Sequence, residues 1–522
     1  MNKMRSKVYS PSVFFYNGIT TSLSSLALRF VGMAFNVYLS SHAGAQAMGL
    51  LSLVYSVWGF VLTAGCAGGG LAAARMCAES ASRGEDAREA CRKCLRYSFL
   101  CAFIIGASFF SASSVLGRLV GDNRSALPMR ILALSLPFVS MSGTLSGYFN
   151  ARQASYKNSV CQISEQIIRI SLTALIFSRM RYADAGTYCT AIIAGGAASE
   201  MLSFVIQYSL FLLDKRASAS AGRCTARLSD IAKITLPVCI SASVRSGLVS
   251  IEHILIPKGL TEFGHTSEEA LALFGTVHGM AIPIILFCIS IPSAFSVLLI
   301  PKIAEKSTVG RMGEIRYVAA RAYRAALIFS FGVASYMTVS AFLLGACLYP
   351  DTEAARYVYL FSPLIPIMYV DSVSDAILKG MGEQLYSMKI NVADAVISVA
   401  CVFLLVPRIG IFGYVIAIYL SEGFNTCASL VRVIRLTGIR IPTVRFVIFP
   451  LLISVAAADL IGIFYRCVGG RTYGALLTVG GISFVILYVL LLLVCGVITR
   501  EERRYYIRLA LNGKGKEHSD KP

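Results

Sequence analysis

The stretch Arg92–Val120, RKCLRYSFLCAFIIGASFFSASSVLGRLV, indicates the fold class of this chain. A short basic block precedes an apolar run of about twenty residues, the length with which an α-helix crosses the hydrocarbon core of a bilayer. This combination of a basic block and an apolar run recurs throughout the 522 residues. We identify fourteen runs: Ser12–Ser40, Ala47–Cys66, Tyr97–Leu119, Pro128–Phe149, Ser159–Phe177, Tyr188–Leu213, Ile234–Pro257, Ala270–Ile300, Ala325–Leu348, Tyr357–Leu378, Ile390–Val406, Ile411–Val431, Phe446–Phe464 and Tyr473–Val497. The sequence therefore predicts an all-α polytopic membrane protein with fourteen transmembrane helices.

Lysine and arginine gather in alternate loops between these runs. Of the 48 basic residues, 35 lie in the two terminal segments and every second loop, and nine lie in the intervening loops. Because basic loops stay in the cytoplasm, we expect a cytoplasmic (inner) membrane protein with both termini cytoplasmic. The net charge of +20 is then explained by the basic loops on the cytoplasmic side of the membrane. It does not indicate a nucleic-acid partner, because no basic helix face is interleaved with aromatic side chains.

Motifs for catalysis and cofactor binding are missing from the sequence. We find no phosphate-binding loop, no GxSxG, no HExxH and no acidic metal cluster. Cys91 and Cys94 form a lone CxxC without a second pair, so we expect two incidental cysteines rather than a zinc or redox site. The sequence predicts a transporter and no enzyme, with no cofactor and no metal. It leaves the coupling ion, Na⁺ or H⁺, open.

The two halves of the chain repeat each other. Arg29 in the first run aligns with Arg245 in the seventh, and Glu200 in the sixth aligns with Glu422 in the twelfth. Each unit holds six helices, an even number, so a pseudo-twofold axis along the membrane normal should relate the two copies. We predict an N-lobe at 1–216, a C-lobe at 217–440, an appended helix pair at 441–498 and a basic cytoplasmic tail at 499–522.

Charged side chains inside the runs mark candidate sites, because a charge in hydrocarbon costs from about 3 to above 10 kcal/mol unless it faces protein or water. Arg29 and Arg245 lack a carboxylate on the adjacent turn of their own helices; Glu252 lies two turns after Arg245. This favours a water-filled cavity. Two arginines across a pseudo-twofold axis suit a forked anion such as phosphate or diphosphate.

Other charges in the runs leave two interpretations open. Glu165 and Arg169 are four residues apart on one helix face, where they either neutralise each other or contact substrate. Glu200 and Glu422 either titrate with a coupling ion or bond to the adjacent serines. We expect His253 and His278 to pack between helices rather than relay protons. The candidate coupling or gating residues are Glu200, Glu422, Glu252, Asp371 and Asp375.

Four stretches carry a resemblance to a known family. Leu145–Gln153, LSGYFNARQ, and Ser164–Ser171, SEQIIRIS, together with Ala78–Glu85 and Gly275–Pro283, resemble the stage V sporulation protein B and oligosaccharide flippase group. That group belongs to the multidrug/oligosaccharidyl-lipid/polysaccharide exporter superfamily and is close to the lipid II flippases. The resemblance implies two six-helix lobes, a helix pair flanking a groove for a polyprenyl tail, and alternating access.

The resemblance also implies a set of substrate contacts. Asn36 stands where relatives often carry a second basic residue, and Gly68–Leu71 reads Gly-Gly-Gly-Leu where relatives commonly have Gly-Leu-Pro. The candidate substrate-binding residues are Arg29, Arg245, Arg169, Glu165 and Asn36, with Gln166 beside them.

The function expected from these features is flipping of a polyprenyl-diphosphate-linked saccharide, lipid II or a related envelope precursor. The partners are then the lipid-linked oligosaccharide and membrane lipids, with cell-envelope biosynthesis enzymes as further candidates. An ion-coupled multidrug exporter of the same superfamily is the alternative, and it should have an acidic cavity and no extra helix pair. A non-transporting scaffold is a third candidate. The glycan, and a role in growth or in sporulation, stay open.

Overall fold

The computed structural model describes residues 11–66, 68–83, 85–180, 183–214, 228–349, 353–439, 444–468 and 473–497. These ranges are helical almost throughout and contain no strand. The elements are α1 (Pro11–Cys66), α2 (Gly69–Ser82), α3 (Ala87–Val120), η2 (Asn123–Ser125), α4 (Ala126–Ala151), α5 (Ser155–Arg179), α6 (Ala185–Leu212), α7 (Leu228–Phe263), α8 (Ser267–Phe274), η4 (Gly275–Ala281), α9 (Ile282–Thr308), α10 (Met312–Leu348), α11 (Glu353–Phe361), η5 (Ser362–Leu364), α12 (Ile365–Gly380), α13 (Gln384–Ile409), α14 (Ile411–Thr437), η6 (Val444–Ile448), α15 (Phe449–Val468) and α16 (Tyr473–Val494).

Thirteen helical segments of the described chain are long and apolar enough to cross a membrane. The first of them, Ser24–Ser82, covers two predicted runs, because α1 continues through both. Gly44 interrupts it with φ 78° and ψ 171°, a backbone conformation open to glycine and strained for other residues. The prediction of an all-α polytopic membrane protein is confirmed, and the count of fourteen spans is a close approximation.

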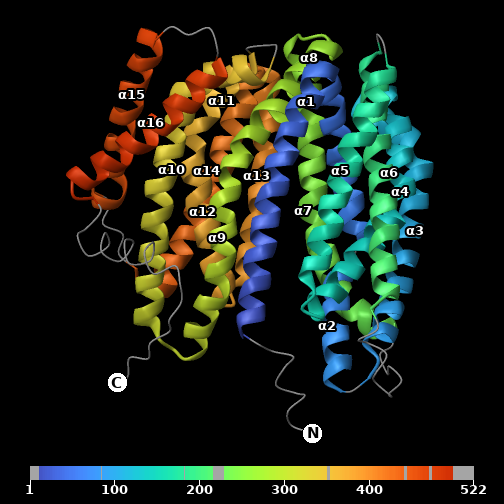
Figure 1. The fold of residues 1–522 in the computed structure, drawn as a ribbon. Coiled ribbons are helices and arrows are strands. Elements are labelled where there is room, and N and C mark those ends of the chain that lie inside the picture. The colour runs from blue at the N-terminus through green and yellow to red at the C-terminus, as the bar shows by residue number, and fades with distance from the viewer. Residues whose placement is uncertain are drawn as a thin grey trace. The chain divides into compact units, whose positions relative to one another are not determined.

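Packing divides the chain into two units: Met1–Ala294 with Glu383–Asn425, and Phe295–Gly382 with Thr426–Pro522. Long helices build each of them (Figure 1). These units differ from the predicted lobes, whose limits remain predictions. The boundaries at residues 216 and 440 and the basic tail at 499–522 lie outside the described residues.

In the first unit, α1 contacts α7, α8 and η4, and two glycines set how closely they approach. A Cβ on Gly49 would lie 2.0 Å from the Leu271 carbonyl oxygen, and a Cβ on Gly275 would lie 2.0 Å from the Ala45 oxygen. Only glycine fits at such a distance, as at close helix crossings in membranes. The backbone of η4 therefore rests directly on that of α1.

The segment Leu145–Gln153, LSGYFNARQ, which carries part of the family resemblance, also has a packing role in this unit. A Cβ on Gly147 of α4 would lie 2.0 Å from the oxygen of Gly70 at the start of α2, so the two helices meet through their backbones. Tyr148 is fully buried with Phe149 and Phe211, and its hydroxyl donates to Asp214 Oδ2 at 3.1 Å. Cys91 lies in the same buried cluster as the two aromatic rings that follow Gly147.

In the second unit, α10 packs against α15 and α16, which correspond to the predicted appended helix pair. Tyr488 of α16 donates to the Ile328 carbonyl oxygen at 2.8 Å, and Tyr336 of α10 donates to the Leu477 oxygen at 2.7 Å. These bonds satisfy the tyrosine hydroxyls inside an apolar cluster. The pair is thus fastened to α10.

Candidate functional site: a polar cavity in the first unit

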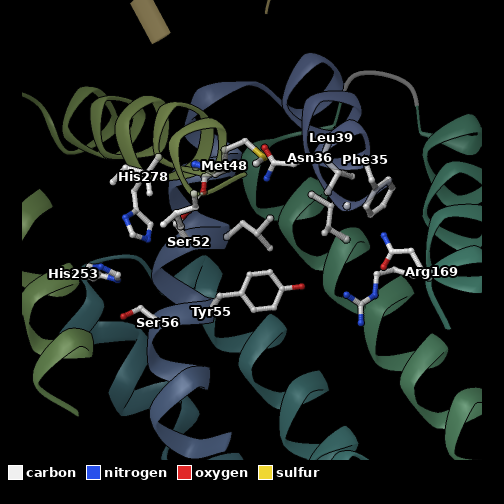
Figure 2. Close-up of a pocket in the computed structure, with 18 residues that line it drawn as sticks. Phe35, Asn36, Leu39, Met48, Ser52, Tyr55, Ser56, Arg169, His253 and His278 are labelled. Atoms are coloured by element: carbon white, nitrogen blue, oxygen red, sulfur yellow. Dashed lines mark hydrogen bonds between the residues drawn. The ribbon is translucent and has the colours of Figure 1, made fainter. Parts of the chain in front are cut away.

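A cavity of about 480 Å³ lies among α1, α5, α6, α7, η4 and the start of α9, and its lining residues all belong to the first unit (Figure 2). Its volume falls within the usual range of small-molecule sites. Among the described residues that line it, Arg169 carries the permanent positive charge and none is a carboxylate. Because every contributing helix is of membrane-spanning length or packs against one, a polar cavity here offers a polar molecule a place inside the bilayer.

Arg169 of α5 interacts with two carboxylates, neither of which is among the residues that line the cavity. Its Nη2 atom lies 2.8 Å from Glu165 Oε1, one turn earlier on α5, and 3.7 Å from Glu200 Oε1 on α6. Its Nε atom donates to Ser199 Oγ at 3.4 Å. The bond to Glu165 is a charge-assisted hydrogen bond, whereas the contact with Glu200 is too long for one. Glu200 Oε2 is buried with no hydrogen-bond partner in the described chain.

Three further polar side chains share the cavity with Arg169. Gln166 lies one turn before it on α5, and Asn36 approaches from α1. Tyr55 extends across the cavity with its hydroxyl directed toward Arg169 (Figure 2). An anion at Arg169 could therefore accept from a guanidinium, an amide and a phenol at once.

The opposite side of the cavity is formed by Ser52 and Ser56 of α1, His253 of α7 and His278 of η4, which we call the polar wall (Figure 2). The two imidazole rings are 4.1 Å apart between centroids, and His278 stacks on Phe274 at 5.2 Å. His278 Nδ1 lies 3.4 Å from the hydroxyl oxygen of Tyr414. The histidines make the helix-packing contacts that the sequence suggested, and they also line the cavity.

Arg29 and Arg245 do not line this cavity, and both side chains are exposed. Arg245 of α7 interacts electrostatically with Asp394 of α13. Arg29 has no ion-pair partner within the described ranges. That the two arginines together hold an anion stays a prediction.

The predicted coupling residues are distributed over both units. Glu252 of α7 accepts a hydrogen bond from Ser398 Oγ of α13 at 2.8 Å. Asp375 of α12 pairs with Lys379 Nζ at 2.6 Å, and Asp371 is half-buried on the same helix. Glu422 is half-buried on α14. Their coupling or gating roles stay predictions.

The adjacent serines proposed as bonding partners of Glu200 and Glu422 bond elsewhere. Ser199 accepts from Arg169, and Ser421 donates to Asp394. Within the described chain, no group of three histidine, cysteine or acidic side chains is placed to hold a metal ion.

Sequence reasoning missed Tyr55 and both serines of the polar wall. Ser52 and Ser56 are one turn apart on one face of α1, a spacing that marks a polar face of a helix. The sequence does not show what that face meets, because this depends on the close contact of α1 with η4.

Comparison with known proteins finds similarity to a protein family, to one curated protein and to solved structures. Residues 14–254 match the model of the polysaccharide biosynthesis protein family. Stage V sporulation protein B of Bacillus subtilis (strain 168) is 22% identical over 411 residues, which cover 76% of this chain and 78% of that protein.

Among solved structures, the lipid II flippase MurJ in an inward closed conformation superposes with a TM-score of 0.67 at 11% identity, covering 94% of this chain and 100% of that one. An inward-facing multidrug resistance MATE family transporter gives a TM-score of 0.63 at 15% identity, covering 80% of this chain and 98% of that one. The resemblance predicted from the sequence is confirmed: the chain is similar to stage V sporulation protein B and has the fold of the MOP superfamily, to which the MATE transporter belongs.

Proposed function

We propose that this protein is a flippase that moves a polyprenyl-diphosphate-linked saccharide across the cytoplasmic membrane by alternating access. The observation that carries the proposal is the cavity in the first unit, where Arg169 is the lining residue with a permanent charge and no described lining residue is acidic. A diphosphate offers several acceptor oxygens to a planar guanidinium, whereas the described lining offers a cationic drug no carboxylate. The match to the polysaccharide biosynthesis protein family and the fold shared with the lipid II flippase MurJ support the same class of substrate.

In this mechanism the diphosphate competes with Glu200 for Arg169. The guanidinium keeps its hydrogen bond to Glu165, which fixes its orientation, while the contact with Glu200 at 3.7 Å leaves donors for an incoming anion. Gln166 and Tyr55 add donors on the cavity side. A diphosphate that is bound in competition with Glu200 can be released when the cavity changes shape between its two access states.

Arg29 and Arg245 fit an earlier binding step. Arg29 precedes the lining residues Gly32 and Asn36 by three and seven residues, so it lies on the same face of α1 about 10 Å before Asn36. Arg245 precedes His253 by eight residues on α7, about 12 Å.

The two arginines approach the cavity from the same direction. α8 contacts α1 shortly after Gly44, and it directly follows the end of α7 in the chain. The segment of α1 before Gly44 and helix α7 therefore both run toward α8. Arg29 and Arg245 therefore precede the cavity-lining residues of parallel helix segments, on the side predicted to be cytoplasmic. They would meet a diphosphate arriving from the cytoplasmic leaflet before it reaches Arg169.

Binding of a diphosphate lipid by the protein in nanodiscs tests this proposal. Arg169→Gln should lower the affinity for farnesyl diphosphate by at least about tenfold, since it removes a charge-assisted contact. Arg130→Gln is the matched control: Arg130 of α4 is also an arginine within a candidate span, but it bonds to Ser113 and Ser114 of α3 and does not line the cavity. Equal affinities for the wild type and the Arg169 variant would contradict the proposal.

A further inference from the structure

The polar wall contains hydrogen-bonding atoms that the protein itself does not use. His253 Nδ1 and Ser56 Oγ are buried and have no hydrogen-bond partner in the described chain, and the same holds for Asn36 Oδ1 elsewhere in the lining of the cavity. His253 is only 8% exposed. Buried polar atoms are nearly always paired in native proteins, so three unpaired ones around one cavity indicate a place where a ligand supplies the partners.

The wall is built by backbone contacts that fix its side chains. Gly279 of η4 approaches α1 so closely that a Cβ would lie 3.0 Å from Met48 Cβ and 3.3 Å from Ser52 Oγ. This brings His278, the preceding residue, to the cavity. On the other side, Ser250 of α7 donates to the Ser56 carbonyl oxygen at 2.7 Å, which ties the helix of His253 to α1. Such π-helical segments as η4 are frequent at functional sites.

The chemistry of the wall suits uncharged, hydroxyl-bearing groups. It contains no carboxylate to attract a cation and no lysine or arginine to hold a second anion. Each serine hydroxyl and each neutral imidazole supplies both a donor and an acceptor, the combination that a sugar hydroxyl or acetamido group also presents. A ligand made only of a diphosphate and a lipid would leave these atoms unused.

The two sides of the cavity therefore differ in what they can bind. Figure 2 shows Arg169 on one side, His253 and His278 on the other, and Tyr55 between them. We propose that the polar wall is a saccharide subsite, which binds the sugar next to the diphosphate while Arg169 binds the diphosphate itself. This inference rests on the proposed function and adds to it a means of distinguishing a sugar-loaded lipid from the bare carrier.

Three probes measured in nanodiscs separate the two sides. They are farnesyl diphosphate, a polyprenyl diphosphate bearing a disaccharide, and dodecyl maltoside, which has a disaccharide and no phosphate. His253→Leu should weaken binding of the two saccharide probes about fivefold, the factor for one lost hydrogen bond of about 1 kcal/mol, and leave farnesyl diphosphate unchanged. Ser56→Ala removes a smaller group and should also weaken binding of the two saccharide probes. His42→Leu is the matched control, because His42 is exposed on α1 and bonds to the Tyr38 oxygen of its own helix.

Arg169→Gln should show the complementary pattern, with weaker binding of both diphosphate probes and unchanged binding of dodecyl maltoside. The subsite is wrong if His253→Leu and Ser56→Ala leave both saccharide probes unaffected, or if they weaken farnesyl diphosphate as much as the disaccharide lipid. If Arg169→Gln changes no diphosphate probe while His253→Leu still weakens dodecyl maltoside, the diphosphate proposal fails and the saccharide subsite stands.

Discussion

Replacing Glu200 with glutamine should strengthen anion binding at Arg169. Glu200 Oε1 lies 3.7 Å from Arg169 Nη2, and the two side chains are 22% and 29% exposed. At that distance the attraction between unit charges is about 1 kcal/mol in the dielectric of water and about 4.5 kcal/mol at an effective dielectric constant of 20. Since the contact is too long for a hydrogen bond, the substitution removes this attraction and little else.

An incoming anion no longer has to compete with that carboxylate, so its affinity should rise. Even the lower limit of about 1 kcal/mol corresponds to about fivefold tighter binding of farnesyl diphosphate. Titration of the protein in nanodiscs measures the change, with Glu79→Gln as control because Glu79 pairs with Arg75 on the exposed face of α2. Unchanged or weaker binding in the Glu200 variant would refute the idea that an anion and Glu200 compete for Arg169.

Three other predictions concern packing, the outlying arginines and topology. Gly147→Ala should lower the unfolding temperature, with a cost of about 1–3 kcal/mol, because its Cβ would meet the Gly70 oxygen; Gly143→Ala on the same helix has open space and should not. Arg29→Ala and Arg245→Ala should each abolish lipid transport while membrane insertion persists, with lysine restoring only part of the activity. Reporter fusions in the loop between α9 and α10 should report a cytoplasmic position.

Each of these predictions has an outcome that would count against it. Equal unfolding temperatures for the two glycine variants would remove the packing explanation of the LSGYFNARQ segment. Full transport by the variant that carries both Arg29→Ala and Arg245→Ala would exclude these two arginines from the substrate path. A periplasmic reporter signal from that loop would reverse the predicted topology.

The fold class was predictable because apolar runs of membrane-spanning length leave few other options for the chain. The sequence could not show that the first two runs form one interrupted helix, because a single glycine, Gly44, makes the break. It also could not define the packing units, which depend on contacts between helices distant in the sequence.

The site was predictable in part. Glu165 and Arg169 stood out because charges are costly in a span, and Asn36 was singled out by its place in the resemblance. The polar wall was not predictable, since serine and histidine are common inside helices, and the wall depends on close contacts of η4 with α1 such as that between Gly275 and Ala45. Neither Arg29 nor Arg245 lines this cavity, and their role in holding an anion stays a prediction.

Transport of a fluorescent polyprenyl-diphosphate disaccharide across vesicles that contain the purified protein tests the central claim most directly. Wild-type protein should make the labelled lipid accessible on both leaflets, Arg130→Gln should do the same, and Arg169→Gln should not. Vesicles in which the wild type leaves this lipid in its original leaflet, yet exports a cationic dye, would contradict the flippase account and identify a multidrug exporter.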